Sequence, residues 1–333
     1  ARRVKTPLRT SVEDISTARK VPETPQTASA TYRLAFADQE FLTSEDTRGV
    51  RFQLEYLKTE FRLRERGINS TVVLFGGARI PEPGKAAWAA RNDIQKKNLE
   101  ANSRFYDEAR RFAQYASLTS RALDYKDYVV VTGGGPGVME AGNRGAHDIG
   151  APSIGMNIVL PHEQAPNVYV TPDLCFNFHY FATRKIHLVL RSRAVAIFPG
   201  GFGTLDEFFE VLTLIQTGRM DRIPLLLFGR DFWDRAINLE ALEEEGTISP
   251  GDTGLFVKVD TAEPGEVRGD VVHMRPAGAV EFPRLHLVVH EPLAGDHLHR
   301  RHPDGVGHHE VLFEIVEHRR LPRVDAMRGK ERS

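Results

Sequence analysis

Tyr128-Val-Val-Val-Thr-Gly-Gly-Gly-Pro-Gly137 is the stretch that decides the fold, because a short run of β-branched residues passes directly into a cluster of glycines. Residues 138–147 then follow as a helix. A buried strand that ends in glycine and opens a helix is typical of a βα unit. The stretch therefore predicts a parallel sheet with crossover helices.

The same strand and glycine turn recur on both sides of this stretch. Ser70–Phe75 ends at Gly76-Gly77, and Ala194–Phe198 ends in Pro199-Gly-Gly-Phe-Gly-Thr204, from which a helix runs over 205–217. Alternating strands and helices predict an α/β fold: a Rossmann-like, doubly wound, mostly parallel sheet flanked by helices. The remaining expected strands are Ser153–Leu160 and Ile223–Phe228, and the remaining expected helices are Arg51–Arg66, Asn98–Ser120 and Tyr180–Arg193.

The texture of the chain changes at both ends, which predicts three parts. Residues 1–48 should form an irregular N-terminal extension with one short helix near Gln39. Residues 49–262 should form the Rossmann-like domain, and residues 263–333 a His-rich C-terminal tail, for which a shifted reading frame is an alternative explanation. A metal site in the tail is disfavoured, because closely spaced histidines without a pattern usually belong to a solvated segment; the residues concerned are Asp296, His297, His299 and His302.

Composition narrows the class of protein. The chain has 333 residues, 44 Lys+Arg against 45 Asp+Glu and a formal net charge of -1, so no nucleic-acid or anionic membrane partner is expected. The single cysteine, Cys175, excludes an internal disulfide and fits a reducing compartment. No apolar stretch approaches the roughly 20 residues of a membrane span, and residues 1–27 lack the apolar core of a signal peptide. We therefore expect a cytoplasmic protein without a membrane partner.

Two glycine-rich loops point to a phosphate ligand. Glycines let the backbone approach a phosphate, and the following helix N-terminus adds free N–H groups. One such loop is more often a plain βα turn, whereas two loops after neighbouring strands could hold one ligand together. Neither loop has the Lys-Ser or Lys-Thr of an NTPase or the spacing of a dinucleotide site, so a mononucleotide or another phosphorylated ribosyl compound fits better.

Charged residues next to the loops suggest chemistry beyond binding. Asp206 and Glu207 are expected in the first turn of the helix after the second loop, where an acidic pair is usually only a partner of the helix dipole. A carboxylate beside a phosphate is costly, however, unless it stabilises a ribosyl cation and orients a water. Glu207 is therefore the first catalytic candidate. Arg184 is the second, because its guanidinium suits phosphate or ribose hydroxyls, although Arg184-Lys185 alone could be a solvated helix start.

The motifs together resemble those of the LONELY GUY (LOG) family, also known as lysine decarboxylase-like proteins. The resemblance covers about residues 50–262 and rests on the segment 132–141, on Arg184-Lys185 and on the segment 199–207. It implies homodimers or higher homo-oligomers, and phosphoribohydrolase activity on nucleoside 5′-monophosphates without a metal or cofactor. It assigns catalysis to Arg184 and Glu207, phosphate binding to Gly134, Gly135, Gly137, Gly201, Gly203 and Thr204, and further substrate contacts to Lys185, Asn157, Gly77 and Met139.

Several points stay open within this resemblance. Lysine decarboxylation would need a pyridoxal phosphate Schiff base, which Lys185 in its Arg-Lys motif does not suggest. The first strand ends in Gly76-Gly77-Ala78-Arg79 where relatives commonly have Gly-Ser, so a ligand-binding hydroxyl is missing. The alternative to a nucleosidase acting on AMP-like or cytokinin-type nucleotides is a non-catalytic nucleotide sensor or a carrier of a phosphorylated cofactor. Candidates for contact with the base are Met156, Phe178, His179 and Phe181.

Overall fold

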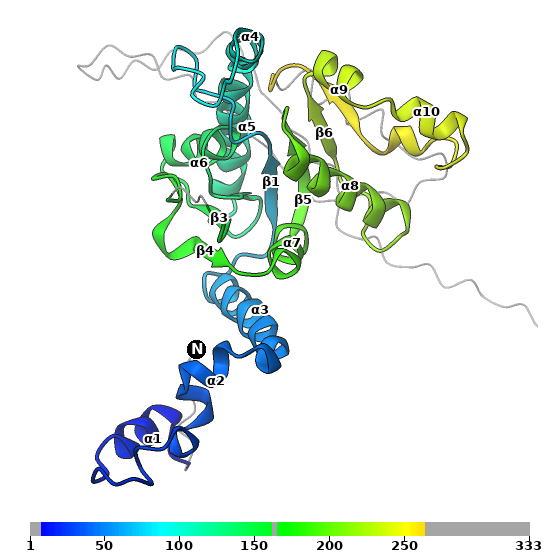
Figure 1. Cartoon of the computed structure of the whole chain (residues 1–333). Helices are drawn as coiled ribbons and strands as arrows, with labels where there is room; N and C mark the ends of the chain where they lie inside the picture. Colours follow the sequence, from blue (N-terminus) through cyan, green and yellow to red (C-terminus); the bar gives the residue numbers. More distant parts are fainter. Residues whose placement is uncertain (1–7, 162–164, 264–333) are drawn as a thin grey trace, which may run out of the picture. The chain divides into compact units, whose positions relative to one another are not determined.

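The computed structural model describes residues 8–161 and 165–263. The chain divides into two compact units between Phe61 and Arg62, and each unit is considered by itself (Figure 1). The His-rich tail from residue 264 onward, with the histidines around 296–302, lies outside the described residues. Within the described ranges, no helix has the length and apolar character needed to cross a membrane.

The N-terminal unit contains more helix than the sequence predicts. The short helix expected near Gln39 is confirmed as α2 (Gln39–Thr43), but α1 (Ser11–Ala18) was not expected. A capping box explains α1, because the Thr10 side chain accepts from the N–H of Glu13 and the Glu13 carboxylate accepts from the N–H of Thr10. The unit also contains three single 3₁₀ turns: η1 (Ala30–Tyr32), η2 (Ala35–Ala37) and η3 (Glu45–Thr47). Helix α3 (Arg48–Glu65) follows and confirms the helix expected over Arg51–Arg66; its residues up to Phe61 belong to this unit.

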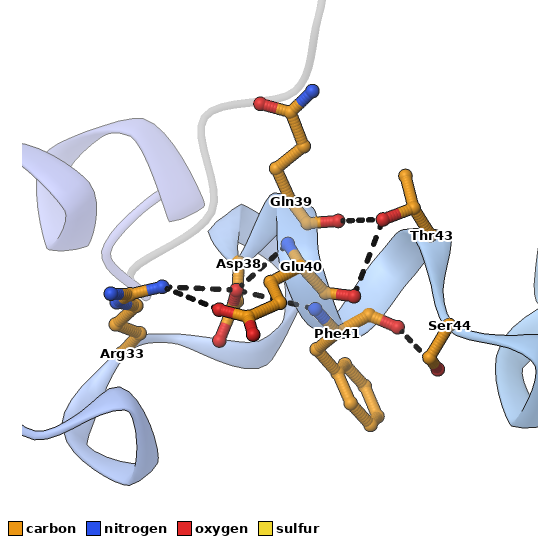
Figure 2. Close-up of polar contacts among 7 residues, drawn as sticks. All are labelled: Arg33, Asp38, Gln39, Glu40, Phe41, Thr43 and Ser44. Carbon is orange, nitrogen blue, oxygen red and sulfur yellow. Dashed lines mark hydrogen bonds and ion pairs between the residues drawn. The ribbon is translucent and has the colours of Figure 1, made fainter.

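Asp38 organises the start of α2 (Figure 2). Its carboxylate accepts hydrogen bonds from the N–H groups of Glu40 and Phe41 at 3.1 and 3.3 Å. Arg33 pairs with Asp38 at 3.6 Å and with Glu40 at 3.5 Å. At the other end the Ser44 hydroxyl donates to the carbonyl of Phe41. Side chains therefore satisfy both ends of a helix that is too short to be stable alone.

The second unit is built on a seven-stranded sheet in which every pair of neighbouring strands is parallel (Figure 1). The predicted doubly wound parallel fold is thus confirmed. Its order is β4-β3-β2-β1-β5-β6-β7. The strands are β1 (Thr71–Phe75), β2 (Val129–Thr132), β3 (Ser153–Ile158), β4 (Cys175–Phe178), β5 (Ser192–Ile197), β6 (Leu225–Phe228) and β7 (Val257–Val259). The edge strands β4 and β7 were not predicted.

Alternating side chains of the strands enter two separate cores. Val73 and Phe75 of β1 belong to one hydrophobic cluster, whereas Val72 and Leu74 belong to the other. Residues of α5 (Arg104–Arg121) and α6 (Val138–Asp148) complete the second cluster, and residues of α7 (Phe181–Val189) and α8 (Phe202–Gln216) contribute to the first. Helices therefore cover both faces of the sheet, which makes its strands apolar on both sides.

Two expectations about these helices need correction, and four short elements were not predicted. The single helix expected over residues 98–120 is wrong, because α4 (Asp93–Asn102) and α5 are separated at Ser103, whose hydroxyl donates to the carbonyl of Glu100 and competes with the helical pattern. The helix expected to continue to Arg193 ends at Val189, and Ser192 opens β5. The helices α9 (Arg230–Ala236) and α10 (Leu239–Glu244) and the turns η4 (Pro172–Leu174) and η5 (Asp252–Leu255) were not predicted.

The strand order determines where a ligand can bind. Strands β1 to β4 are added in one direction from β1, and β5 to β7 are added in the other. The direction of winding therefore reverses between β1 and β5, and the crevice beyond the carboxyl ends of these strands is the usual ligand site of such sheets.

Candidate functional site

Three loops, rather than two, meet at the carboxyl ends of the central strands. The glycine loops follow β2 and β5, which are not neighbours because β1 lies between them. The N–H of Gly77, just after β1, donates to the carbonyl of Pro199 at 2.9 Å. The carbonyl of Gly77 in turn accepts from the N–H of Val138 at 3.3 Å. The loop after β1 thus joins the two glycine loops directly.

Gly137 shows how close this contact is. Its φ is +69°, and a Cβ at this position would lie 2.5 Å from the carbonyl oxygen of Gly77. Only glycine fits both the backbone conformation and the space. Gly137 is therefore needed to pack one loop on the other, in addition to its predicted place at the phosphate.

The first glycine loop has one amide that faces inward. The N–H of Gly134 donates to the Thr132 hydroxyl at 2.9 Å, and its carbonyl accepts from both the backbone N–H and the side-chain amide of Asn167 at 2.9 and 3.0 Å. Gly134, predicted to bind phosphate, thus uses its N–H within the protein. The N–H groups of Gly135 and Gly137 remain the backbone donors of this loop that could face an anion.

The second glycine loop leaves open space at the start of a helix. Helix α8 begins at Phe202, with Gly201 as an N-cap that has no capping side chain. The first-turn N–H groups of Phe202, Gly203 and Thr204 have no carbonyl one turn earlier to bind. A Cβ at Gly201 or Gly203 would meet nothing within 4 Å. This end of α8 can therefore accept an anion, in line with the predicted role of these residues.

The earlier start of α8 changes the position of the acidic pair. The helix was expected to begin at Leu205, with Asp206 and Glu207 in its first turn. Because α8 begins at Phe202, its first turn contains no acidic residue. Placement in the first turn is thus wrong, and a simple interaction of Glu207 with the helix dipole cannot explain its position.

Arg184 on α7 connects three parts of the site. The side chain is buried, and the residue is 8% exposed. Its Nε donates to the carbonyl of Met156 on β3 at 2.8 Å, and its Nη1 donates to the Glu207 carboxylate on α8 at 3.1 Å. A Cβ at Gly133 would lie 2.6 Å from Nη2 of Arg184. The structure thus brings the two predicted catalytic residues together, against the first glycine loop.

Burial gives Glu207 an unusual acidity. Its side chain is 12% exposed. Burial raises the pKa of Glu207 to about 7; the charge and hydrogen bond of Arg184 oppose this, while Asp206 and Glu210 add to it. A carboxyl group of this kind can exchange a proton at neutral pH, which is the property a general base requires.

Lys185 interacts with a different set of carboxylates. Its Nζ lies 3.2 Å from Asp206 and 3.4 Å from Glu210. Burial alone would lower the pKa of Lys185. The Asp206 hydrogen bond and the charges of both carboxylates have the larger combined effect, so the pKa is raised above its usual value. These three residues line part of a surface depression of about 360 Å³. Lys185 is thus next to Arg184 in the sequence but pairs with Asp206 and Glu210, whereas Arg184 pairs with Glu207.

The other predicted substrate contacts are placed around the first loop. Asn157 is buried on β3, donates to the carbonyl of Phe176 at 3.0 Å, and lies where a Cβ of Gly134 would be. Met139 lies against Gly133 and Gly135, since a Cβ on either would fall 2.8 Å from its side chain. Asn157 and Met139 therefore pack against the first glycine loop, and their contact with a ligand stays a prediction.

Candidates for contact with a base divide into two groups. Met156 and Phe178 are each 1% exposed and belong to the hydrophobic core, so the expectation that they contact the base is wrong. His179 and Phe181 are exposed. Sequence reasoning missed Phe202, which is 92% exposed within the second glycine loop. It also missed Asn167, for which no motif gave a signal.

Metal-ligand residues do not gather at the site. Among residues 8–161 and 165–263, no group of three or more His, Cys, Asp or Glu is placed to hold a metal ion. Cys175 is a free thiol on β4 and accepts from the Asn157 amide at 3.4 Å.

The chain is similar in sequence to one family model and to several known enzymes. Residues 139–265 match a family model described as possible lysine decarboxylase. Two cytokinin riboside 5′-monophosphate phosphoribohydrolases of Arabidopsis thaliana are 30% identical over 149 residues and 28% identical over 138 residues, covering 44% and 40% of this chain and 66% and 63% of their own lengths. A probable enzyme of the same name from Oryza sativa subsp. japonica is 30% identical, over 44% of this chain and 57% of its length. The chain thus spans less than two thirds of these relatives.

Two solved structures are similar to the chain at a low level. A molybdenum cofactor binding protein from Rippkaea orientalis has a TM-score of 0.38 and 19% identity, over 62% of this chain and 94% of that one. A Moco carrier protein from Chlamydomonas reinhardtii has a TM-score of 0.37 and 17% identity, over 62% of this chain and 97% of that one. At these TM-scores neither likeness bears on the function of the chain.

Proposed function

Because the chain belongs to the LONELY GUY (LOG) family of Rossmann-like proteins, we propose that it is a nucleoside 5′-monophosphate phosphoribohydrolase. It hydrolyses the N-glycosidic bond of AMP-like or cytokinin-type nucleotides to free base and ribose 5-phosphate. The observation that carries this proposal is the buried contact of 3.1 Å between Arg184 and Glu207 beside the first glycine loop. Residues 49–262 form the nucleotide-binding domain in this proposal.

Backbone amides bind the 5′-phosphate. The open start of α8 offers the N–H groups of Phe202, Gly203 and Thr204, and the first loop adds those of Gly135 and Gly137. These donors carry the partial positive charge of two helix N-termini. The phosphate anchors the nucleotide, so its free energy of binding can hold the ribose in position for reaction.

Glu207 acts on C1′ of the ribose. As the bond between C1′ and the base nitrogen breaks, its electron pair leaves with the base, and positive charge develops on the ribosyl ring. The Glu207 carboxylate stabilises this charge and accepts a proton from the water that attacks C1′. The departing base takes up one proton in turn, so one water is consumed for each base released. Arg184 holds the carboxylate in place and binds phosphate or ribose oxygens.

Exposed apolar residues of α7 and α8 suggest where a second copy of the chain binds. Phe181, Ile186 and Leu190 of the α7 region and Phe202 of α8 are large apolar residues that are more than a third exposed. Large apolar side chains left exposed at the surface favour an interface with another chain. We propose that they pair in a homodimer.

Product analysis tests the function. The purified protein is incubated with AMP, GMP, CMP, UMP and isopentenyladenosine monophosphate, and free base and ribose 5-phosphate are separated. Glu207→Gln keeps the size of the side chain but removes the base, whereas Glu240→Gln changes an exposed carboxylate on α10 as the matched control. We expect base release by the parent and the control alone. Nucleotide binding by intact protein without base release would instead indicate the sensor or carrier.

A further inference from the structure

Asn167 makes an unusual number of contacts with the first glycine loop. Its Nδ2 lies 3.0 Å from the carbonyl oxygens of both Gly134 and Gly135, and 2.9 Å from Oδ1 of Asn143. Its backbone N–H donates to the carbonyl of Gly134 at 2.9 Å. An amide has two hydrogens, so at least one of them is shared between acceptors. One side chain thus contacts two consecutive carbonyls of the loop.

The contacts close a ring on Gly134. The N–H of Gly134 donates to the Thr132 hydroxyl, which donates to Oδ1 of Asn143 at 2.7 Å. The same oxygen accepts from Asn167, which returns to the carbonyl of Gly134. Asn143 is fully buried, and its Nδ2 donates to the Ser153 hydroxyl of β3 at 3.0 Å. The ring is therefore attached to the sheet and α6, and both polar groups of Gly134 are satisfied.

Neighbouring contacts fix the orientation of Asn167 itself. Its Oδ1 accepts from the N–H of Tyr169 at 3.2 Å, so the amide nitrogen is the end that faces the loop. The Tyr169 ring in turn contacts two residues of α6, with centroid distances of 5.4 Å to both the Arg144 guanidinium and the His147 ring. The segment that carries Asn167 is thus held against the helix that the loop opens.

The ring of hydrogen bonds through Gly134, Thr132, Asn143 and Asn167 determines where the loop amides point. In a trans peptide the carbonyl and the following N–H point in opposite directions, and the described part of the chain has no cis peptide bond. The carbonyl of Gly134 faces Asn167, so the N–H of Gly135 faces away from it. Gly134 has a φ of +75°, which the ring holds in place. The carbonyl of Gly135 also faces Asn167, and the next residue, Pro136, has no N–H to place.

We infer that Asn167 is a positioning residue of the phosphate site, which holds the carbonyls of Gly134 and Gly135 back so that the Gly135 amide faces the anion. This inference rests on the proposed function, because it assigns the anion to the 5′-phosphate of the nucleotide. The hydrogen bonds of the Asn167 side chain go to Gly134, Gly135, Asn143 and Tyr169, and none of them goes to Glu207. Its loss should therefore weaken phosphate binding and leave the chemical step intact.

Two substitutions of Asn167 test this role. Asn167→Asp replaces the donor Nδ2 by an oxygen that repels both carbonyls, and Asn167→Ser removes the amide without adding charge. Asn98→Asp, at an exposed position of α4, introduces the same charge as a control. The readouts are the Kd for inorganic phosphate by calorimetry, and KM and kcat for the nucleotide that the parent hydrolyses best. Circular dichroism establishes that each variant is folded.

Both variants should raise the Kd for phosphate and the KM roughly tenfold or more, with kcat within about threefold of the parent, as expected for a misplaced binding group. The control should match the parent. Unchanged phosphate affinity in either folded variant, or a loss confined to kcat, overturns the inference; if Asn167→Asp does not fold, Asn167→Ser decides. A parent that binds phosphate but releases no base would refute the proposed function, and the calorimetry would still judge Asn167. A parent that binds no phosphate overturns both.

Discussion

Replacing Glu207 by glutamine should change how stability depends on pH. Burial raises the pKa of Glu207 to about 7 from an ordinary 4.5. Because the folded-state pKa is the higher one, the folded protein keeps this proton between these pH values while the unfolded chain releases it, so the parent loses stability as pH rises through this window. The shift corresponds to about 3 kcal/mol in total, of which about 2.5 kcal/mol falls between pH 5 and pH 8.

The glutamine variant lacks this loss, because its side chain does not ionise. Its free energy of unfolding should therefore gain about 2.5 kcal/mol on that of the parent between pH 5 and pH 8. The altered contact with Arg184 contributes equally at both pH values and cancels in this difference. Urea unfolding at the two pH values measures it, with Glu240→Gln as the exposed control. A difference between variant and parent that is the same at both pH values would refute the raised pKa and, with it, the case for Glu207 as a base at neutral pH.

Three further predictions concern activity, packing and assembly. The kcat/KM of the parent should rise with pH up to about 7 and then level off, because Glu207 acts in its ionised form; a flat profile across this range would contradict that role. Gly137→Ala should lower the free energy of unfolding by about 3 kcal/mol or more, because it adds a clash with Gly77 to a left-handed backbone, whereas Gly218→Ala, with φ +68° and open space, should cost about 1 kcal/mol. Equal losses in urea unfolding would show that the loop contact is unimportant. Ile186→Glu should convert the dimer into a monomer in light scattering with no loss of secondary structure, and a parent that is itself monomeric would contradict the proposed interface.

The central strands could be predicted because they are buried on both faces. Each is a short, continuous apolar run that ends at glycine or proline, so its sequence alone indicates a strand of a parallel sheet. The edge strands gave a weaker signal: β7 has three residues, Val-Lys-Val, and β4 reads Cys-Phe-Asn-Phe. Their pairing depends on a neighbouring strand already in place, which no local pattern reveals.

The site was predictable in its residue types but not in its connections. The motifs named Arg184 and Glu207, and the fold places them in contact. The acidity of Glu207 depends on burial by the whole fold, which the sequence does not express. The inward-facing amide of Gly134 and the proposed role of Asn167 depend on the directions of backbone carbonyl groups. Residue types in the sequence do not indicate these directions. Sequence patterns therefore predict the candidate site, and backbone geometry decides which of its groups are left for a ligand.

The position of β1 next to β5 has a consequence for synthesis on the ribosome. The first four strands can pair as soon as residue 178 has emerged, but the partner of β1 on its other side begins only at Ser192. Until then β1, with the sequence Thr-Val-Val-Leu-Phe, is an open apolar edge that another nascent chain could join. The growing chain is thus exposed to aggregation during the time between the synthesis of β4 and that of β5. A chaperone that binds short apolar segments would be useful in this period.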